Sequence, residues 1–228
     1  MQELFSVFTG IFVGVLVLVP STGSKFIAVG PLNLNGATLF FPITFIFNDI
    51  LTEVYGYARA RRIIWIGLGM QVFAAFAYWI ISIWPPAPFW TNQEAFMTIL
   101  GVAPRITLAS LSAYFCGEFA NSVVISKMKY SQHGARGLTQ AWRYIASTIV
   151  GEGVDSVVFM TVGFLGTMTA RDLVQTMVTI WIVKVVYEAV ATPFSVWFAN
   201  WVKRVEGMDK IDDPQDLSYN PFRFLRVR

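Results

Sequence analysis

Six apolar segments, each about as long as a helix that crosses a lipid bilayer, constrain this sequence more than any other feature. About 20 residues of α-helix span the hydrocarbon layer of a membrane. Only 14% of the 228 residues are charged and 55% are hydrophobic, whereas roughly 25% of residues are charged in a soluble domain. The sequence therefore predicts an all-α integral membrane protein with six transmembrane helices, at about residues 4–22, 37–57, 63–84, 106–126, 144–167 and 173–201.

The distribution of basic residues predicts that both termini are cytoplasmic. Basic residues gather after the second and fourth segments and in the C-terminal tail, whereas the opposite side carries only Lys25, Arg105 and Arg171. Loops rich in Lys and Arg remain in the cytoplasm. We therefore expect a six-helix transmembrane domain over residues 1–203 and a cytoplasmic tail over residues 204–228.

Ionisable residues recur near the middle of four segments. Those that lie about eleven or twelve residues into a segment, or roughly 18 Å deep at 1.5 Å per residue, are Asp49, Glu118, Asp155 and Lys184. Three more lie about one turn nearer the cytoplasm, namely Glu53, Glu152 and Glu188. Facing lipid, these seven side chains would cost on the order of 20 kcal/mol. We therefore expect them to line one interior cavity.

The carboxylates in this set outnumber its one base, Lys184, by six to one. Three outcomes would restore the balance: some carboxyls carry a proton, a cation such as H⁺ or Na⁺ binds, or a substrate brings donors or a positive charge. All three suit a transporter. The alternative is that these side chains form structural ion pairs and interhelical hydrogen bonds, and this stays open for single residues such as Glu188.

Other functional classes find less support. No basic face with interleaved aromatic residues is present, so we expect no nucleic-acid partner. The one cysteine, Cys116, excludes an internal disulfide, and we expect no metal and no cofactor. The one histidine, His133, falls in a predicted loop, and no H-E-x-x-H or G-x-S-x-G motif occurs, so we do not expect an enzyme. An ion channel is a weaker alternative, because carboxylate rings also line pores.

Several short motifs share a specific order and spacing: Asn48-Asp49-x-x-Thr52-Glu53-Val54-Tyr55-Gly56, Gly117-Glu118-x-x-Asn121-Ser122, Trp142-x-Tyr144, Gly151-Glu152, Asp155-Ser156, Lys184, Glu188, Thr192-Pro193 and Asn220-Pro221-Phe222. Together they resemble the queuosine-precursor transporters, which are grouped with vitamin-uptake transporters. The resemblance implies a multi-pass protein of the bacterial inner membrane. It also implies import of 7-deazaguanine precursors of queuosine, in the 7-cyano or 7-aminomethyl form.

The chemistry of such a substrate fits the predicted cavity. A carboxylate can accept the N1–H and the exocyclic amine of a guanine-type edge together, and an Asn amide can donate to its carbonyl. The predicted substrate-binding residues are Asn48, Asp49, Glu53, Glu118, Asn121, Glu152, Asp155, Lys184 and Glu188. The predicted aromatic walls are Phe45, Phe119 and Trp181.

The remaining expected partners are the lipid bilayer, a coupling ion (H⁺ or Na⁺) and a second copy of the chain. An alternative is a substrate-binding subunit of a multi-component, ATP-driven uptake system. The chain has no G-x-x-x-x-G-K-[ST] phosphate loop, so a partner would have to use the ATP.

Overall fold

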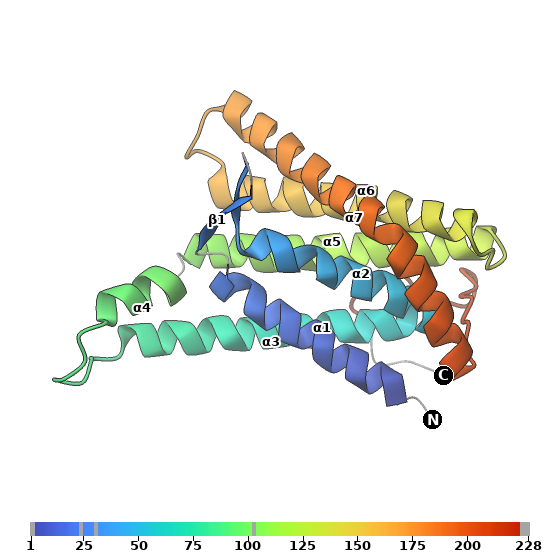
Figure 1. Ribbon diagram of the computed structural model, residues 1–228, viewed down its shortest axis with the longest axis horizontal. Coiled ribbons are helices and arrows are strands. Elements are labelled where there is room, and N and C mark those ends of the chain that lie inside the picture. The colour runs from blue at the N-terminus through green and yellow to red at the C-terminus, as the bar shows by residue number, and fades with distance from the viewer. Residues whose placement is uncertain (1–2, 23–24, 30–31, 102–103, 224–228) are drawn as a thin grey trace.

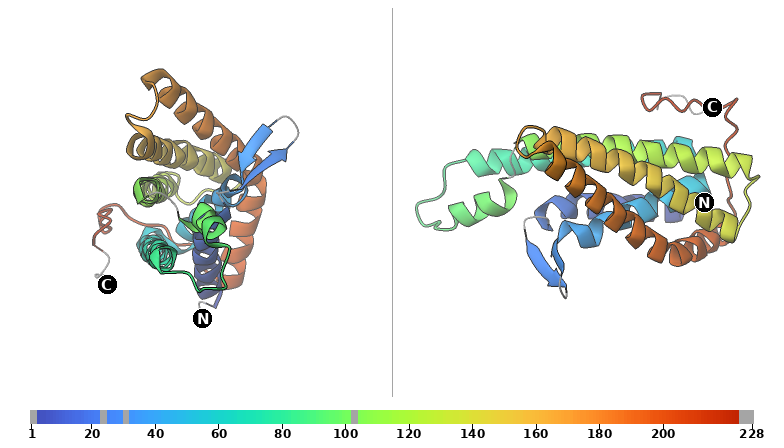
Figure 2. Two further views of the ribbon diagram at one scale, coloured as in Figure 1. Left: turned by 90° about the vertical axis from the view of Figure 1, so that its left-hand side faces the viewer. Right: turned by 90° about the horizontal axis from the view of Figure 1, so that it is seen from above.

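The computed structural model describes residues 3–22, 25–29, 32–101 and 104–223, which form a bundle of long helices (Figure 1). The helices are α1 (Glu3–Thr22), α2 (Ala37–Tyr55), α3 (Tyr57–Ile83), α4 (Gln93–Leu100), α5 (Pro104–Ser131), α6 (Leu138–Phe164) and α7 (Ala170–Glu206). A short antiparallel hairpin, β1 (Phe26–Val29) and β2 (Leu32–Asn35), pairs Phe26 with Asn35 and projects from the bundle (Figure 2).

Five helical stretches of the described chain are long and apolar enough to cross a membrane: α1, α3, α4 together with α5, α6, and α7. The chain is therefore a multi-pass membrane protein that is almost entirely α-helical. The remaining long helix, α2, contains Asp49 and Glu53 and is not among the five. Its 19 residues correspond to about 28 Å at 1.5 Å per residue, so a sixth span stays a prediction.

Several predicted boundaries differ from the structure. The connection expected at residues 58–62 is wrong, because Gly56 alone separates α2 from α3 and the arginines that follow it lie within α3. Gly56 has φ 83°, and a Cβ there would lie 2.8 Å from Asp212 Oδ1. Glycine meets both demands, since it adopts positive φ without strain and has no Cβ. The hairpin and α4 were not expected, and both fall in predicted loops.

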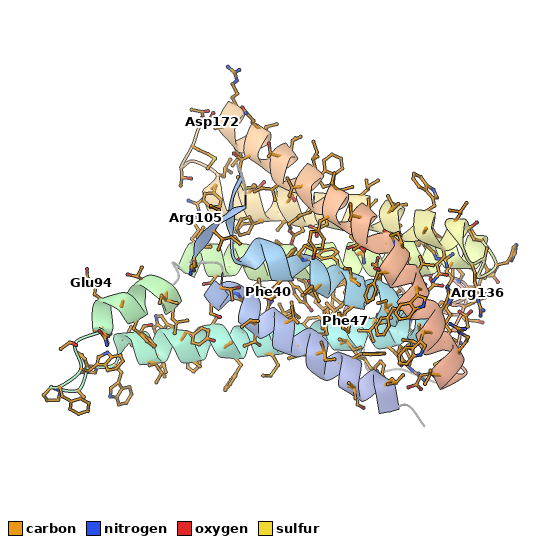
Figure 3. All side chains as sticks on the ribbon, in the orientation of Figure 1. Phe40, Phe47, Glu94, Arg105, Arg136 and Asp172 are labelled. Carbon is orange, nitrogen blue, oxygen red and sulfur yellow. The ribbon has the colours of Figure 1, made fainter. Side chains whose placement is uncertain are left out.

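Figure 1 places the beginning of α1 and the end of α7 at the same end of the bundle, with the α2–α3 junction and the α5–α6 loop. Figure 3 shows Arg136 at this end and Glu94, Arg105 and Asp172 at the other. This arrangement fits an even number of spans. The cytoplasmic location of this end follows from the basic residues and stays a prediction.

Three helices, α2, α5 and α6, dominate the packing around the predicted site. The α2 helix contacts α1, α3, α5 and α7, so it lies inside the bundle. The α5–α6 pair packs most closely, because glycines face each other there. A Cβ at Gly117 would lie 2.9 Å from Asp155 Cβ and 3.1 Å from the Gly151 carbonyl, and a Cβ at Gly151 would lie 2.7 Å from Asn121 Cβ. Small residues allow such approaches in membranes, and this one brings Asn121 of α5 against α6.

We predict that Gly117→Leu and Gly151→Leu each destabilise the protein by about 1–3 kcal/mol, because added volume in a close-packed contact forces the helices apart. Thermal unfolding in detergent measures this. Gly69→Leu on α3 is the control, since a Cβ there has nothing within 4 Å. Equal melting temperatures for all three variants would contradict the packing argument.

Candidate functional site

Asparagine, serine and threonine side chains connect α2 to α5 at mid-length. The Asn48 amide donates to the Glu118 carbonyl over 3.2 Å, and its oxygen accepts from Ser122 Oγ over 3.0 Å. Thr52 Oγ1 lies 3.2 Å from Ser122 Oγ. One residue further along α2, Asp49 Oδ1 accepts a 2.6 Å hydrogen bond from the Asn121 amide. These bonds fix the orientation of both amides and hold one oxygen of Asp49.

Lysine 184 connects α7 to α6 at the same level. Its ammonium lies 2.5 Å from Asp155 Oδ2 and 2.7 Å from Glu152 Oε2. The two carboxylates are three residues apart on α6 and so share a face. The same ammonium lies 4.0 Å from the centre of the Phe41 ring, a cation–π contact. Lys184 is therefore held by two carboxylates and one aromatic face.

We define the interior polar cluster as the eight residues that these contacts and their burial bring together: Asn48, Asp49, Glu118, Asn121, Glu152, Asp155, Lys184 and Glu188. Seven of them are at most 5% exposed, and the side chain of Lys184 is 16% exposed. The ionisable side chains that we expected to avoid lipid are thus buried inside the bundle. The close approach of α5 and α6 brings the α2–α5 and α6–α7 groups against each other.

Three carboxylates of the interior polar cluster have at least one oxygen without a hydrogen-bond partner among the described residues. Both oxygens of Glu118, both oxygens of Glu188 and Oδ2 of Asp49 are buried and accept no hydrogen bond. Five carboxylates face one ammonium here, and that ammonium already binds two of them. A buried charge without a partner is strongly unfavourable. These oxygens therefore require protons, a cation, water or the donors of a ligand.

The aromatic residues of the predicted walls lie in three different surroundings. Phe45 is fully buried, and its ring would lie 3.2 Å from a Cβ at Gly151. Phe119 packs instead with Phe115 and Trp65, at ring-centre distances of 4.8 and 6.5 Å. Trp181 donates to the Ile149 carbonyl over 3.0 Å and lines a surface cavity of about 180 Å³. Only Phe45, with the unpredicted Phe41 5.5 Å away, adjoins the interior polar cluster.

Glu53 lies in a second group of charges, which we call the terminal ion-pair cluster: Glu53, Lys129, Arg143, Lys203 and Asp209. Arg143 binds both oxygens of Glu53 through Nε and Nη2, over 3.0 and 2.8 Å, and Lys203 adds a 2.6 Å contact. The side chains of Glu53 and Arg143 are completely buried. Glu53 is therefore saturated by bases, unlike the carboxylates of the interior polar cluster.

The C-terminal tail closes this end of the bundle. Asp209 contacts both Lys129 and Lys203, the latter over 3.0 Å. Asp212 accepts from the Tyr57 backbone N–H over 2.7 Å and from Ser126 Oγ over 3.1 Å. Burial alone would raise the pKa of Asp209, but hydrogen bonds and charge from Lys129 and then Lys203 lower that pKa to about 2. The tail carboxylate is thus ionised at any physiological pH.

The motif Asn220-Pro221-Phe222 has a structural role in this tail. The Asn220 carbonyl accepts from Arg61 over 2.9 Å, and the Pro221 carbonyl accepts from Trp65 Nε1 over 2.9 Å. The Phe222 ring packs on Trp65 at 5.7 Å. These contacts fasten the tail to α3.

The ion pairs of the terminal ion-pair cluster were not predicted from the sequence. Lys129, Arg143 and Lys203 counted there as bases of loops and tail, yet each is at most 4% exposed. The predicted topology did indicate this pairing in part, because it places Glu53 and these three bases near the cytoplasmic ends of their segments. Their pairing through Asp209 depends on the path of the tail, which no periodicity predicts.

A helical bundle that crosses the membrane several times and encloses unsatisfied carboxylates defines a class of membrane transport proteins. The family model described as "Putative vitamin uptake transporter" matches residues 35–198, and the chain belongs to this family. It is 28% identical over 164 residues to a protein of Bacillus subtilis (strain 168) named "Probable queuosine precursor transporter". The aligned region covers 72% of this chain and 68% of that protein. No solved structure gives a significant match.

We predict that Glu53→Gln destabilises the protein by about 3–5 kcal/mol, because it leaves the buried charges of Arg143 and Lys203 without their shared partner. Chemical or thermal unfolding in detergent measures the change. Arg136→Gln is the control: its side chain is 57% exposed beside Asp209, and exposed pairs contribute about 0–1 kcal/mol. A loss below about 1 kcal/mol for Glu53→Gln would contradict the role of the cluster.

The stabilisation by Asp209 should depend on pH in a defined window. Its folded pKa of about 2 lies below the ordinary value of 3.8, so the stabilisation is complete above about pH 4 and is lost as pH falls from there toward 2. The melting temperature of Asp209→Asn should therefore fall below wild type by the same amount at pH 5 and pH 8. The difference should shrink at pH 3. Asp216→Asn, on an exposed part of the tail, should match wild type throughout.

Proposed function

We propose that this protein imports a 7-deazaguanine precursor of queuosine, in the 7-cyano or 7-aminomethyl form, across a bacterial inner membrane. The name of the Bacillus relative supports this substrate class, and the membership in a transporter family supports the transport step. The observation that carries the proposal is a set of buried carboxylate oxygens without donors, on Asp49 and Glu118, beside two fixed amides.

The substrate supplies the donors that these oxygens lack. Its N1–H and exocyclic amine form a pair of parallel donors, which a carboxylate accepts through two charge-assisted hydrogen bonds. Glu118 offers two unoccupied oxygens for this, and it is completely buried. Each Asn side chain has two N–H donors and uses one in the described contacts. The second N–H of Asn48 or Asn121 then donates to the substrate carbonyl.

The flat ring of the substrate requires an apolar wall, and Phe45 with Phe41 supplies it. Aromatic faces stack on planar rings and contribute about 0.5–1.5 kcal/mol beyond the buried area. The paired residues Glu152, Asp155 and Lys184, on α6 and α7, adjoin this wall, because the Lys184 ammonium lies 4.0 Å from the centre of the Phe41 ring. The substrate-contacting set that we propose is thus Asn48, Asp49, Glu118 and Asn121, with Glu53 assigned to the terminal ion-pair cluster.

We predict that Asp49→Asn and Glu118→Gln each lower queuosine in tRNA at least about tenfold, because losing a charge-assisted bidentate pair removes more than 1.4 kcal/mol of binding. The assay uses a strain that lacks its own importer and its own precursor synthesis, supplied with the 7-cyano compound. Asp155→Asn should also reduce import, because it removes one partner of Lys184. Protein levels in the membrane are measured in parallel.

Glu94→Gln is the matched control, since Glu94 is an exposed carboxylate on α4, at the other end of the molecule (Figure 3). It should restore queuosine like the unchanged protein. Normal queuosine levels with Asp49→Asn, Glu118→Gln and Asp155→Asn, at normal expression, would refute the proposed site.

A further inference from the structure

Glu188 is a buried carboxylate that neither the substrate contacts nor the ion pairs explain. It lies on α7, one turn beyond Lys184, and is 1% exposed. Neither of its oxygens has a hydrogen-bond donor among the described residues. Lys184 does not pair with it, because its ammonium lies on Asp155 and Glu152. Glu188 therefore has no protein group that could stabilise a negative charge.

The charged neighbours of Glu188 make a negative charge there less favourable still. The carboxylates close enough to interact electrostatically with it are Asp49 of α2 and Glu152 of α6. The other titratable groups on α2 and α6 are Glu53, Tyr55, Arg143, Tyr144 and Asp155, and α1, which packs on α7 through Phe8 and Phe198, has none from Leu4 to Thr22. The α7 helix itself adds Arg171, Asp172, Lys184, Tyr187, Lys203, Arg204 and Glu206. Arg143, Lys184 and Lys203 are each bound to another carboxylate, and Arg171 and Arg204 lie near the two ends of α7, about 24 Å from Glu188 at 1.5 Å per residue. No base in this set remains to neutralise Glu188.

A bound proton satisfies these constraints better than a metal ion does. The described residues contain no group of three or more His, Cys, Asp or Glu side chains arranged to hold a metal. Protonation removes the charge and turns one oxygen into a donor. Protonation forms one O–H bond on the carboxyl and breaks one in a hydronium ion, which becomes water, and release of the proton reverses both changes.

We infer that Glu188 binds a proton that moves with the substrate, so that the protein is a proton-coupled importer. The inference rests on the proposed function for its substrate and adds the energy source. Glu188 lies at the junction of α7 with α2 and α6, because α7 packs mainly against these two helices and the Glu188 carboxyl interacts with Asp49 of α2 and Glu152 of α6. The carboxyl is protonated while this junction is closed and releases its proton when the junction opens to water.

The experiment uses the purified full chain in liposomes that contain a pH-sensitive dye. The outside is held about one pH unit below the inside in sodium-free potassium buffer, with valinomycin to clamp the membrane potential. The probe is 7-cyano-7-deazaguanine, which is neutral. If one proton accompanies each probe molecule, a gradient of one pH unit supplies about 1.4 kcal/mol per molecule. It therefore supports at most about tenfold accumulation of the probe. We expect accumulation toward this limit, with acidification of the interior that begins when the probe is added.

Glu188→Gln separates coupling from binding. We expect this variant to exchange labelled for unlabelled probe across the membrane but to accumulate none above the outside concentration. Glu94→Gln should accumulate the probe like the unchanged protein. The same liposomes carry no ATP-driven partner, so gradient-driven accumulation also argues against an ATP-dependent subunit.

Three results would overturn the inference in different ways. Uptake that stops at equal concentrations, without acidification, refutes proton coupling and leaves the proposed import function intact. The absence of both uptake and exchange by the unchanged protein refutes the import function and the coupling together. Accumulation that persists in Glu188→Gln, or acidification that it still supports, excludes Glu188 as the proton site even if uptake is proton-coupled.

Discussion

The cost of burying negative charge between apolar helices governs the rest of this structure. Six carboxylates lie inside the bundle, and each is at most 5% exposed. An unpaired buried charge is strongly unfavourable, so each carboxylate must find a partner within the fold or obtain one from outside it. The fold supplies partners for half of them: Glu53 through three bases, and Glu152 and Asp155 through Lys184. Asp49, Glu118 and Glu188 are left with oxygens that the protein does not satisfy.

We propose that this division separates the structural part of the molecule from the functional part. At one end, the bases of the terminal ion-pair cluster match the charges of Glu53 and Asp209, and the tail fastens α3 and α5 through Asp212. Removing one partner of such a pair is costly because the opposite charge stays buried without a partner. In the interior, a ligand that brings donors would gain binding energy from the oxygens of Asp49, Glu118 and Glu188 that no described residue satisfies. We propose that the substrate satisfies Glu118 and Asp49 and that a proton satisfies Glu188.

Much of the interior could be predicted from the sequence by counting depth. Asp49, Glu118, Asp155 and Lys184 fall at one level because the segments cross the membrane in alternating directions and helical rise is constant. The contacts of Asn121 with Asp49 and of Lys184 with Asp155 agree with that level. Depth alone placed Phe119 wrongly, because it follows Glu118 on α5 but its ring packs against Trp65 and Phe115. Depth places a residue along a helix, whereas helix rotation and the choice of neighbouring helix determine what it touches.

The sequence by itself determined the class of the molecule: apolar segments of spanning length require helices, since a backbone in lipid must satisfy its own hydrogen bonds. It also determined that carboxylates exceed bases in the interior. Only the tertiary structure decided which carboxylates are paired. Glu53 and Asp49 are four residues apart on α2, yet one is saturated by Arg143 and Lys203 and the other keeps an unsatisfied oxygen. The difference arises because the bases arrive from α6, α7 and α5, and their position relative to α2 depends on the packing at Gly117 and Gly151 and on the path of the tail.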